Sequence, residues 1–329
     1  MIRPASRTLC TSQDKGATDL LAQVSAVMES IESWHVEQPL PITACGPSSD
    51  FSGDFLVTEL PSADRKFART AWRSSDTMGP MDLIAKQPRI DDAFGRVLAQ
   101  CWEAGAVPWS AVEVVERDDG LIAANDASRY FSEPAQWSAL DRWAWEQAEG
   151  RVLDVGCGGG RHAVPWVARR HEVVGVDPSP GAVPITRERG AEALVGSVPS
   201  LPEELGRFDT IALCGNSLGL LGGPEQAPHV LSALAAAARP GALLVGTGTD
   251  PGDGAGTVHS GYHSWNLSRG RARGQLRLRV RDGAVTTPWF DYWLASPDEF
   301  AATLGGSAWT LETLERDPTG SGYAVCLRR

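Results

Sequence analysis

The stretch from Arg151 to Arg161, RVLDVGCGGGR, decides the fold of this chain. It opens with the largely apolar run Val152–Val155, which predicts a buried strand, and it leads into a helix that we expect to begin near Arg161. Glycine reaches positive φ and carries no Cβ that would keep a ligand from the backbone. The N-terminus of the following helix presents free N–H groups. The stretch therefore predicts a strand, a ligand-binding loop and a helix, with loop glycines at Gly156, Gly158 and Gly160.

Segments on both sides of this stretch predict the rest of the sheet. Apolar runs alternate with helical segments, and this alternation is typical of a parallel sheet with helices on both faces. The expected strands are Arg151–Val155, Glu172–Val176, Ala193–Val195, Asp209–Leu213 and Ala242–Thr247, with a clear helix at Pro224–Ala238. After them we expect a hairpin of Gln275–Arg281 and Ala284–Leu294, a helix at Pro297–Leu304 and an antiparallel pair at Thr310–Glu315 and Tyr323–Leu327.

The chain divides into three regions. Residues 1–80 are rich in Ser, Thr, Pro and Asp and predict a poorly ordered extension, with a small helical lid or a docking arm as the alternative. Residues 81–149 predict a helical cap, with an apolar helix at Ile90–Ala104, a hairpin over 111–123 and a tryptophan-rich helix at Pro134–Ala148. Residues 150–329 predict the core, with an inserted hairpin over 274–294.

Composition excludes several classes of protein. The formal charge of −11 argues against nucleic acid as the main partner, because phosphate binding needs an excess of Lys and Arg. The sequence contains no run of about 18 apolar residues, so it predicts no membrane-spanning helix. The six cysteines are widely spaced, which suits reduced thiols in the cytoplasm better than disulfides or a zinc site. We therefore expect a cytoplasmic protein without metal, and the sequence does not indicate its oligomeric state.

The spacing of the glycines distinguishes between several classes of nucleotide-binding loop. A dinucleotide fingerprint, G-x-G-x-x-G, requires glycine where this chain has Arg161. The chain instead carries D-x-G-x-G-x-G from Asp154, whose carboxylate would repel a pyrophosphate and attract an ammonium group. No G-x-x-x-x-G-K-[ST] loop is present in the sequence, so a Walker-type nucleotide hydrolase is excluded. An NAD-dependent dehydrogenase remains a rival interpretation at this point.

The segment Asp154–Gly160 resembles motif I of class I S-adenosylmethionine-dependent methyltransferases. Asp177 is similar to the family's ribose-binding acidic residue, and Arg239-Pro240-Gly241 is similar to its turn before the fifth strand. The resemblance implies an α/β Rossmann-like, doubly wound, mostly parallel sheet with a terminal antiparallel strand, a helical N-terminal cap and an inserted β-hairpin. It implies S-adenosylmethionine as the cofactor, bound by Tyr130, Asp154, Gly156, Cys157, Gly158, Gly160, Arg161, Asp177, Pro178, Ser197, Val198, Cys214 and Asn216, although Ser197 replaces the Asp that is frequent in the family.

Residues that follow the core strands in the sequence are candidates for binding the methyl acceptor. His263 and His259 are candidate general bases because imidazole accepts protons near neutral pH, with structural histidines as the alternative. Asp291 is a further candidate, as a base or as the partner of a cationic acceptor, against simple packing with arginine. We expect acceptor contacts from Asn216, Tyr262, His263, Asn266, Trp289, Phe290 and Tyr292.

The resemblance and these residues predict methyl transfer to N, O or C of a small molecule, with aromatic or heterocyclic specialised metabolites favoured. Asn216 is followed by Ser217-Leu218-Gly219 rather than by the P-P-Y/F of nucleic-acid amino methyltransferases, which argues against a nucleobase acceptor. Two alternatives stay open: a peptide or protein methyltransferase, and a non-catalytic binding protein with the same fold.

Overall fold

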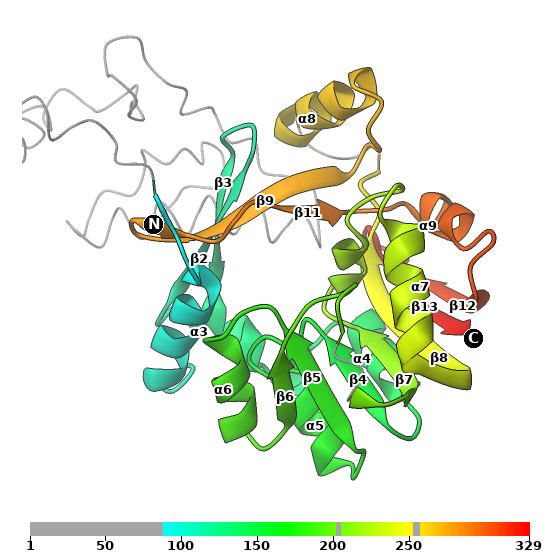
Figure 1. Cartoon of the computed structure of the whole chain (residues 1–329). Coiled ribbons are helices and arrows are strands. Elements are labelled where there is room, and N and C mark those ends of the chain that lie inside the picture. The colour runs from blue at the N-terminus through cyan, green and yellow to red at the C-terminus, as the bar shows by residue number, and fades with distance from the viewer. Residues whose placement is uncertain (1–87, 202–204, 253–256) are drawn as a thin grey trace, which may run out of the picture.

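The computed structural model describes residues 88–201, 205–252 and 257–329 (Figure 1). The expectations for residues 1–80 lie outside these residues. The larger sheet has seven strands in the order β12-β13-β8-β7-β4-β5-β6. Its strands are β4 (Val152–Val155), β5 (Val173–Asp177), β6 (Glu192–Val195), β7 (Phe208–Leu213), β8 (Ala238–Thr249), β12 (Thr310–Arg316) and β13 (Gly322–Arg328). The sheet is parallel from β8 to β6, and β13 and β12 add antiparallel strands, so the predicted fold class is confirmed.

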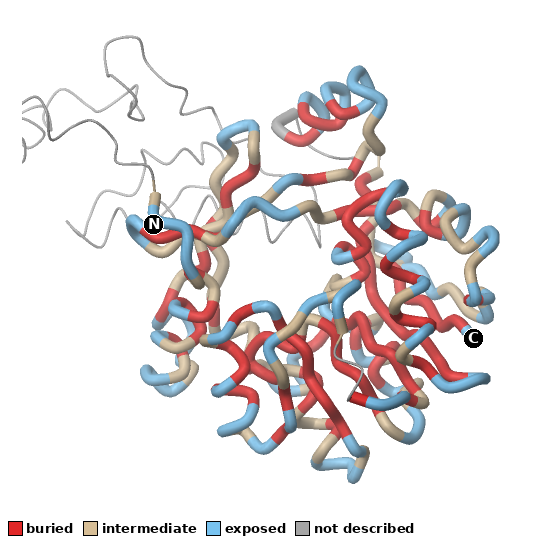
Figure 2. Tube along the Cα trace, in the orientation of Figure 1, coloured by how far each residue is buried: buried red, intermediate tan, exposed pale blue. Residues whose placement is uncertain are grey.

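Successive residues of the central strands enter different apolar clusters. Leu153 packs in one cluster with Leu231 and Phe300, whereas Val152 packs in another with Trp145 and Trp166. This alternation explains why the parallel strands are apolar at nearly every position: both faces of the sheet are covered. Figure 2 shows the buried residues concentrated in this sheet. The covering helices are α4 (Ala139–Glu146), α5 (Ala163–Ala168), α6 (Ala182–Glu188), α7 (Ala227–Ala237) and α9 (Pro297–Thr303).

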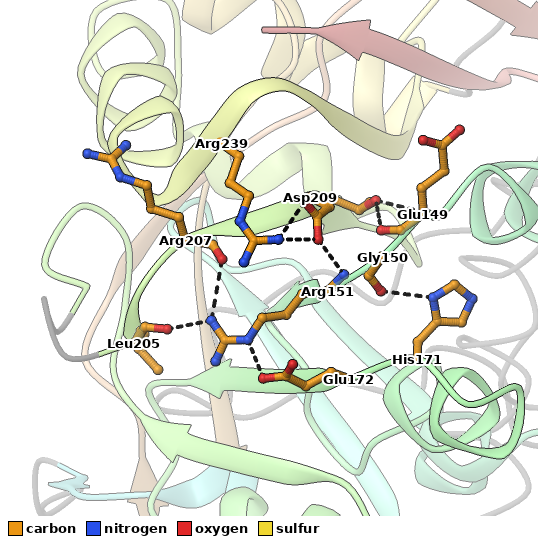
Figure 3. Close-up of polar contacts among 10 residues, drawn as sticks. Glu149, Gly150, Arg151, His171, Glu172, Leu205, Arg207, Asp209 and Arg239 are labelled. Atoms are coloured by element: carbon orange, nitrogen blue, oxygen red, sulfur yellow. Dashed lines mark hydrogen bonds and ion pairs between the residues drawn. The ribbon is translucent and has the colours of Figure 1, made fainter.

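A polar network holds the strands together at the amino end of β4, the opposite end from the glycine loop (Figure 3). Asp209 accepts hydrogen bonds from the Arg151 backbone N–H at 2.8 Å and from Arg239 at 2.6 Å. Arg151 also donates to the Leu205 carbonyl and pairs with Glu172. This network joins the starts of β4, β7 and β8. Because it lies at the opposite end of the strand from the glycine loop, we assign it to the stability of the sheet.

A second sheet is built from two distant parts of the chain. Its strands run in the order β1-β10-β9-β2-β3, with β11 also paired to β9. The hairpin β2 (Val112–Arg117) and β3 (Ile122–Asp126) comes from the predicted cap, whereas β9 (Gln275–Asp282) and β11 (Phe290–Trp293) come from the predicted insertion. The short β1 (Arg89–Ile90) and β10 (Val285–Thr286) complete it. Cap and insertion therefore form one sheet, which lies across the upper end of the core in Figure 1.

Three expected elements differ in the structure. The helix expected from Ile90 begins only at Ala93, because Ile90 belongs to β1 and Asp92 caps the helix by accepting from the Gly95 N–H. The single strand expected at Ala284–Leu294 is wrong: β10 and β11 are separate strands, and Pro288, which has no N–H to donate, lies between them. The helix expected from Pro134 begins only at Ala139, because Ser138 caps it by accepting from the Asp141 N–H. The remaining helices are α3 (Ala93–Glu103), η3 (Ala127–Phe131), η4 (Pro134–Gln136), η6 (Ser217–Leu221) and α8 (Thr257–Ser268). None of the helices in the described ranges has the length and apolarity that crossing a membrane requires.

Candidate functional site

The glycine loop follows β4, as the sequence predicts. Its three glycines have positive φ angles of 75°, 50° and 79° at Gly156, Gly158 and Gly160. A Cβ built on Gly160 would lie 3.1 Å from Cγ2 of Thr186, and one on Gly158 would lie 3.6 Å from the Tyr130 ring. The positive φ angles favour glycine at all three positions, and at Gly160 the close approach of Thr186 does so as well.

Asp154 ends in an unpaired carboxylate oxygen at the start of this loop. The residue is 2% exposed, and its Oδ2 has no hydrogen-bond partner within the described part of the chain. Burial raises the pKa of Asp154 to about 6, although His162 and the Ala163 N–H act to lower it. A buried oxygen without a partner is costly. This carboxylate is therefore suited to an ammonium group brought in by a ligand.

Asp177 joins the glycine loop to the loop after β5. Its Oδ2 accepts from the Gly158 N–H and its Oδ1 from the Ser179 N–H, each at 2.9 Å. Burial raises its pKa to about 6. Each carboxylate oxygen has two lone pairs, so one on each remains free of these bonds. Two vicinal hydroxyls of a ribose match that capacity.

Asp141 on α4 organises the residues behind the loop, and the sequence analysis missed it. Its carboxylate accepts from Arg161 at 2.9 Å, from His162 at 3.0 Å and from the Gly215 N–H at 2.8 Å. Burial acts to raise its pKa, but His162 and Arg161 hold the pKa well below its usual range. Asp141 thus connects the start of α5 to the loop after β7. Its place in a tryptophan-rich amphipathic helix gave no sequence signal for this role.

Tyr130 lies between the glycine loop and the second sheet. Its ring packs edge-on against Phe94, with ring centres 5.1 Å apart, and it lies beside Gly158. Its hydroxyl donates to Oε1 of Glu113 at 2.9 Å, and Asn125 donates to Oε2 at 2.9 Å. Glu113 and Asn125 were not predicted, because Glu113 resembles an ordinary polar position in a hairpin strand.

Tyr292 and Asn216 link the second sheet to the loop after β7. The Tyr292 hydroxyl donates to the Asn216 carbonyl, and a Cβ on Gly219 would lie 2.2 Å from the Tyr292 ring. Asn216 has φ of 68°, and its Oδ1 accepts from Thr249 at 3.0 Å. The structure thus brings two predicted acceptor residues, Asn216 and Tyr292, into direct contact.

The other predicted residues around β11 point in different directions. Trp289 precedes β11 and is exposed beneath the Arg279 guanidinium, 4.5 Å from its ring centre. Phe290 pairs with Leu278 in the register and is 37% exposed. Asp291 accepts from Gln226 at 3.1 Å and lies 3.9 Å from Arg271, which corresponds to the alternative of simple polar packing.

The predicted residues on α8 share its buried side. They are His259, Tyr262, His263 and Asn266, at the i, i+3, i+4 and i+7 positions of the helix. Tyr262 packs with Leu276 and Leu294, and Tyr292 packs against the same cluster. Asn266 donates to the carbonyls of Arg273 and Gln275. The helix therefore belongs with the second sheet.

Arg117 of β2 contacts two residues on the buried side of this helix. It lies 3.2 Å from Nδ1 of His259 and 4.0 Å from the ring centre of Tyr262. Burial and the Arg117 charge lower the pKa of both His259 and His263 to about 4, so both imidazoles are neutral at pH 7. Nε2 of His263 is buried without a partner in the described residues.

The remaining predicted donor residues lie around the glycine loop and the strand ends. Cys157 is buried against Val183 and Ala193, and Cys214 is buried in the cluster that contains Trp137. Burial raises the pKa of both thiols well above its ordinary value. Pro178 and Ser197 are exposed, whereas Val198 packs against the core. Among the residues the structure describes, no group of three metal-ligating side chains occurs.

The seven-stranded sheet, mostly parallel with two antiparallel strands at one edge, is a Rossmann-like fold. Residues 152–241 match a family described as methyltransferase domain. The chain contains a class I S-adenosylmethionine-dependent methyltransferase domain.

A solved structure and two curated relatives are similar to the chain. A methyltransferase from Bacteroides fragilis in complex with S-adenosyl-L-homocysteine has a TM-score of 0.59 and 20% identity, over 74% of this chain and 96% of that one. A ubiquinone biosynthesis O-methyltransferase from Azorhizobium caulinodans is 36% identical over 67 residues, 18% of this chain and 26% of that protein. An uncharacterized protein from Mycobacterium tuberculosis is 64% identical over 36 residues, 11% of this chain and 8% of that protein. The chain therefore spans only a minor part of these two curated relatives.

Proposed function

We propose that this chain transfers a methyl group from S-adenosylmethionine to a small-molecule acceptor held between the glycine loop and the second sheet. The observation that carries the proposal is the unpaired Oδ2 of buried Asp154 at the start of the loop. The donor contains an ammonium group and a ribose, and Asp154 and Asp177 supply suitable partners for both.

The donor supplies a methyl group activated by a sulfonium. In the proposal, Asp154 receives the ammonium group, Asp177 the ribose hydroxyls, and Ser197 and Val198 lie toward the adenine. In the same proposal the donor carboxylate is bound by Arg161, whose guanidinium pairs with Asp141. Correct positioning in an in-line geometry supplies much of the rate of such a transfer, up to about 7–11 kcal/mol in favourable systems.

The acceptor is proposed to contact Asn216, Tyr292 and the adjoining α8 residues. The aromatic side chains on this side favour an aromatic or heterocyclic metabolite. His263, His259 and Asp291 remain candidate bases. The pKa of about 4 at both histidines makes their neutral imidazoles weak proton acceptors, which favours hydrogen bonding to the acceptor over proton removal.

Calorimetry with S-adenosylhomocysteine tests the donor site. We expect binding to the wild type, a loss of at least about tenfold in affinity for Asp154→Ala, and no change for Asp298→Ala, an exposed aspartate on α9. A wild type that binds neither this ligand nor S-adenosylmethionine would show a non-catalytic protein or a different ligand.

A mass screen with isotopically labelled donor then tests the acceptor class. Labelled methyl groups on small molecules support the proposal. Transfer to peptides alone would favour the peptide or protein methyltransferase.

A further inference from the structure

Glu113 is a buried carboxylate that the donor site does not use. It lies at the start of β2 and is 5% exposed. The register places Val115 opposite Val280 and Arg117 opposite Leu278, so Glu113 shares its face with these residues by alternation. Tyr292, opposite Leu276, belongs to the same face and contacts the core at Asn216. Glu113 therefore lies on the side of the second sheet that meets the methyltransferase core.

The hydrogen-bond partners of Glu113 are neutral. Tyr130 donates to one carboxylate oxygen and Asn125 to the other, and Glu113 makes no ion pair within the described ranges. By contrast, Glu116 on the opposite face of β2 pairs with Arg279 and Arg281. Although the charge of Arg129 reaches Tyr130 and Tyr292, the groups bonded to Glu113 are neutral, so a cationic ligand can compensate the charge of this buried carboxylate.

Tyr130 places this carboxylate beside the donor loop. The ring that lies 3.6 Å from the Gly158 Cβ position carries the hydroxyl bonded to Glu113, so one side chain spans the distance between them. Each carboxylate oxygen has used one of its two lone pairs. A free acceptor position thus remains on each oxygen, and a single tyrosine side chain lies between the carboxylate and the glycine loop.

We infer that Glu113 recognises a primary or secondary amine on the acceptor, which makes nitrogen the methylated atom. This inference rests on the proposed function and narrows its acceptor to amine-bearing small molecules. Glu113 acts together with two positioning residues: Tyr130 and Asn125 fix its carboxylate through their hydrogen bonds.

The reaction balances without a further reagent. The bound ammonium group first gives one proton to Glu113, which releases it to water. The nitrogen lone pair then forms the bond to the methyl carbon as the carbon–sulfur bond breaks and S-adenosylhomocysteine leaves. The product is the methylated ammonium ion, so one proton is released in total for each methyl group transferred. A carboxylate that accepts N–H donors stabilises the ammonium forms before and after transfer.

Matched amine and alcohol pairs provide the test. Benzylamine with benzyl alcohol, and tryptamine with tryptophol, are offered to the wild type with labelled S-adenosylmethionine, and their binding is measured in the presence of S-adenosylhomocysteine. We expect the amine of at least one pair to bind and to be methylated at least tenfold faster than its alcohol. Faster methylation of the alcohols, or neither binding nor methylation of any amine, overturns the inference.

Variants separate recognition from folding. Glu113→Gln preserves the size of the side chain and should raise the KM for the amine at least tenfold, while the affinity for S-adenosylhomocysteine changes less than twofold. Glu113→Asp should restore part of the activity, and Glu116→Gln is the control from the opposite face of β2. Unchanged kinetics in Glu113→Gln overturn the inference. If the wild type fails to bind S-adenosylhomocysteine, the proposed function itself fails.

Discussion

Buried carboxylates around the glycine loop differ in the cations that surround them. Asp141 contacts Arg161 and His162, whereas Asp154 has an unpaired oxygen and Asp177 binds two backbone N–H groups. The pKa values follow these surroundings: the pKa of Asp141 is lowered, and those of Asp154 and Asp177 are raised by burial to about 6. Asp141 is therefore a structural anchor, whereas in the proposed function Asp154 and Asp177 receive the donor.

Donor affinity should fall as the pH decreases through 6. An acid with a pKa of about 6 is protonated over this range, so Asp154 loses the charge that attracts an ammonium group. Between pH 7.5 and pH 5 we expect the affinity for S-adenosylhomocysteine to fall about tenfold. Calorimetry at several pH values across this range measures the change in affinity. Asp154→Asn should bind more weakly and show a flatter profile, with the residual slope due to Asp177; an equal slope in the variant would contradict the assignment.

Asp141→Asn should weaken both the fold and the donor site. It leaves Arg161 and His162 without their shared carboxylate, and loss of one partner of a buried ion pair costs about 3–5 kcal/mol. Because the folded-state pKa is lowered, the stabilisation by Asp141 is complete above an unfolded pKa of about 3.9 and is lost at lower pH. Thermal unfolding at pH 7 and pH 3 should show a difference between wild type and variant that narrows at pH 3. Glu146→Gln, an exposed change on the same helix, serves as the control.

The sequence predicted part of this residue set. Asp154 and Asp177 follow strands at recognisable spacing, so their positions are visible in a single chain. Asp141 and Glu113 acquire their roles from distant partners: Asp141 bonds Gly215, 74 positions away, and Glu113 bonds Tyr130, 17 positions away. No local periodicity records such contacts.

At the scale of elements, the helix α3 is fixed to the loop after Asp177. Asp92 caps the helix by accepting from the Gly95 N–H at 2.8 Å. The same carboxylate accepts from Ser179 at 2.8 Å and from the Gly181 N–H at 2.7 Å. A Cβ on Gly95 would lie 2.7 Å from the Gly181 Cα, so the two backbones are in close contact. The Asp92 side chain thus joins α3 to the loop after β5.

Asp92→Ala should destabilise the protein by about 1–2 kcal/mol through loss of the cap. We also expect a several-fold loss of affinity for adenosine-containing ligands, because the loop beside Asp177 loses its anchor. Chemical denaturation and calorimetry measure the two effects. Asp91→Ala, which removes the exposed neighbouring carboxylate, should change neither by a comparable amount. Equal effects from both variants would show that α3 and the loop are fixed by other contacts.

The core elements were predictable and the second sheet was not. Strands such as β4 and β5 are apolar at most positions and alternate with helices, which is a local pattern. The pairing of β2 with β9 depends on contacts between distant segments, since Glu116 and Arg279 are 163 positions apart. The sequence predicted the first hairpin and, with one unbroken second strand instead of two, the inserted hairpin, but nothing in it showed that they join.

At the scale of the molecule, the two sheets meet through a few tyrosines. Tyr130 contacts Gly158 and Glu113, and Tyr292 packs on Gly219 and donates to Asn216. Tyr323, which is buried in the core, has a hydroxyl without a partner in the described residues. Substitution of tyrosine by phenylalanine removes a single oxygen atom. It therefore tests the contact between the sheets at Tyr292, with Tyr323 as a comparison inside the core.

Tyr292→Phe should loosen the contact between the sheets. Loss of its hydrogen bond to Asn216 is expected to destabilise by about 1 kcal/mol. Amide hydrogen exchange in β11 and η6 should accelerate several-fold, whereas exchange in β4 and β5 should not change. Tyr323→Phe is the matched control and should leave exchange at both places unaltered. Accelerated exchange throughout the molecule in Tyr292→Phe would contradict a local role.

The divided origin of the second sheet has a consequence for synthesis on the ribosome. β2 and β3 emerge early, but β9 and β11 emerge only after the five parallel strands of the core, β4 to β8. Until β9 is synthesised, the edge of β2 has no partner strand. Isolated two-stranded hairpins are marginally stable in water. The glycine loop can form while the second sheet is still incomplete. A nascent chain arrested before β9 should therefore expose the edge of β2. Chaperones that bind exposed strands would recognise the chain at this stage of its synthesis.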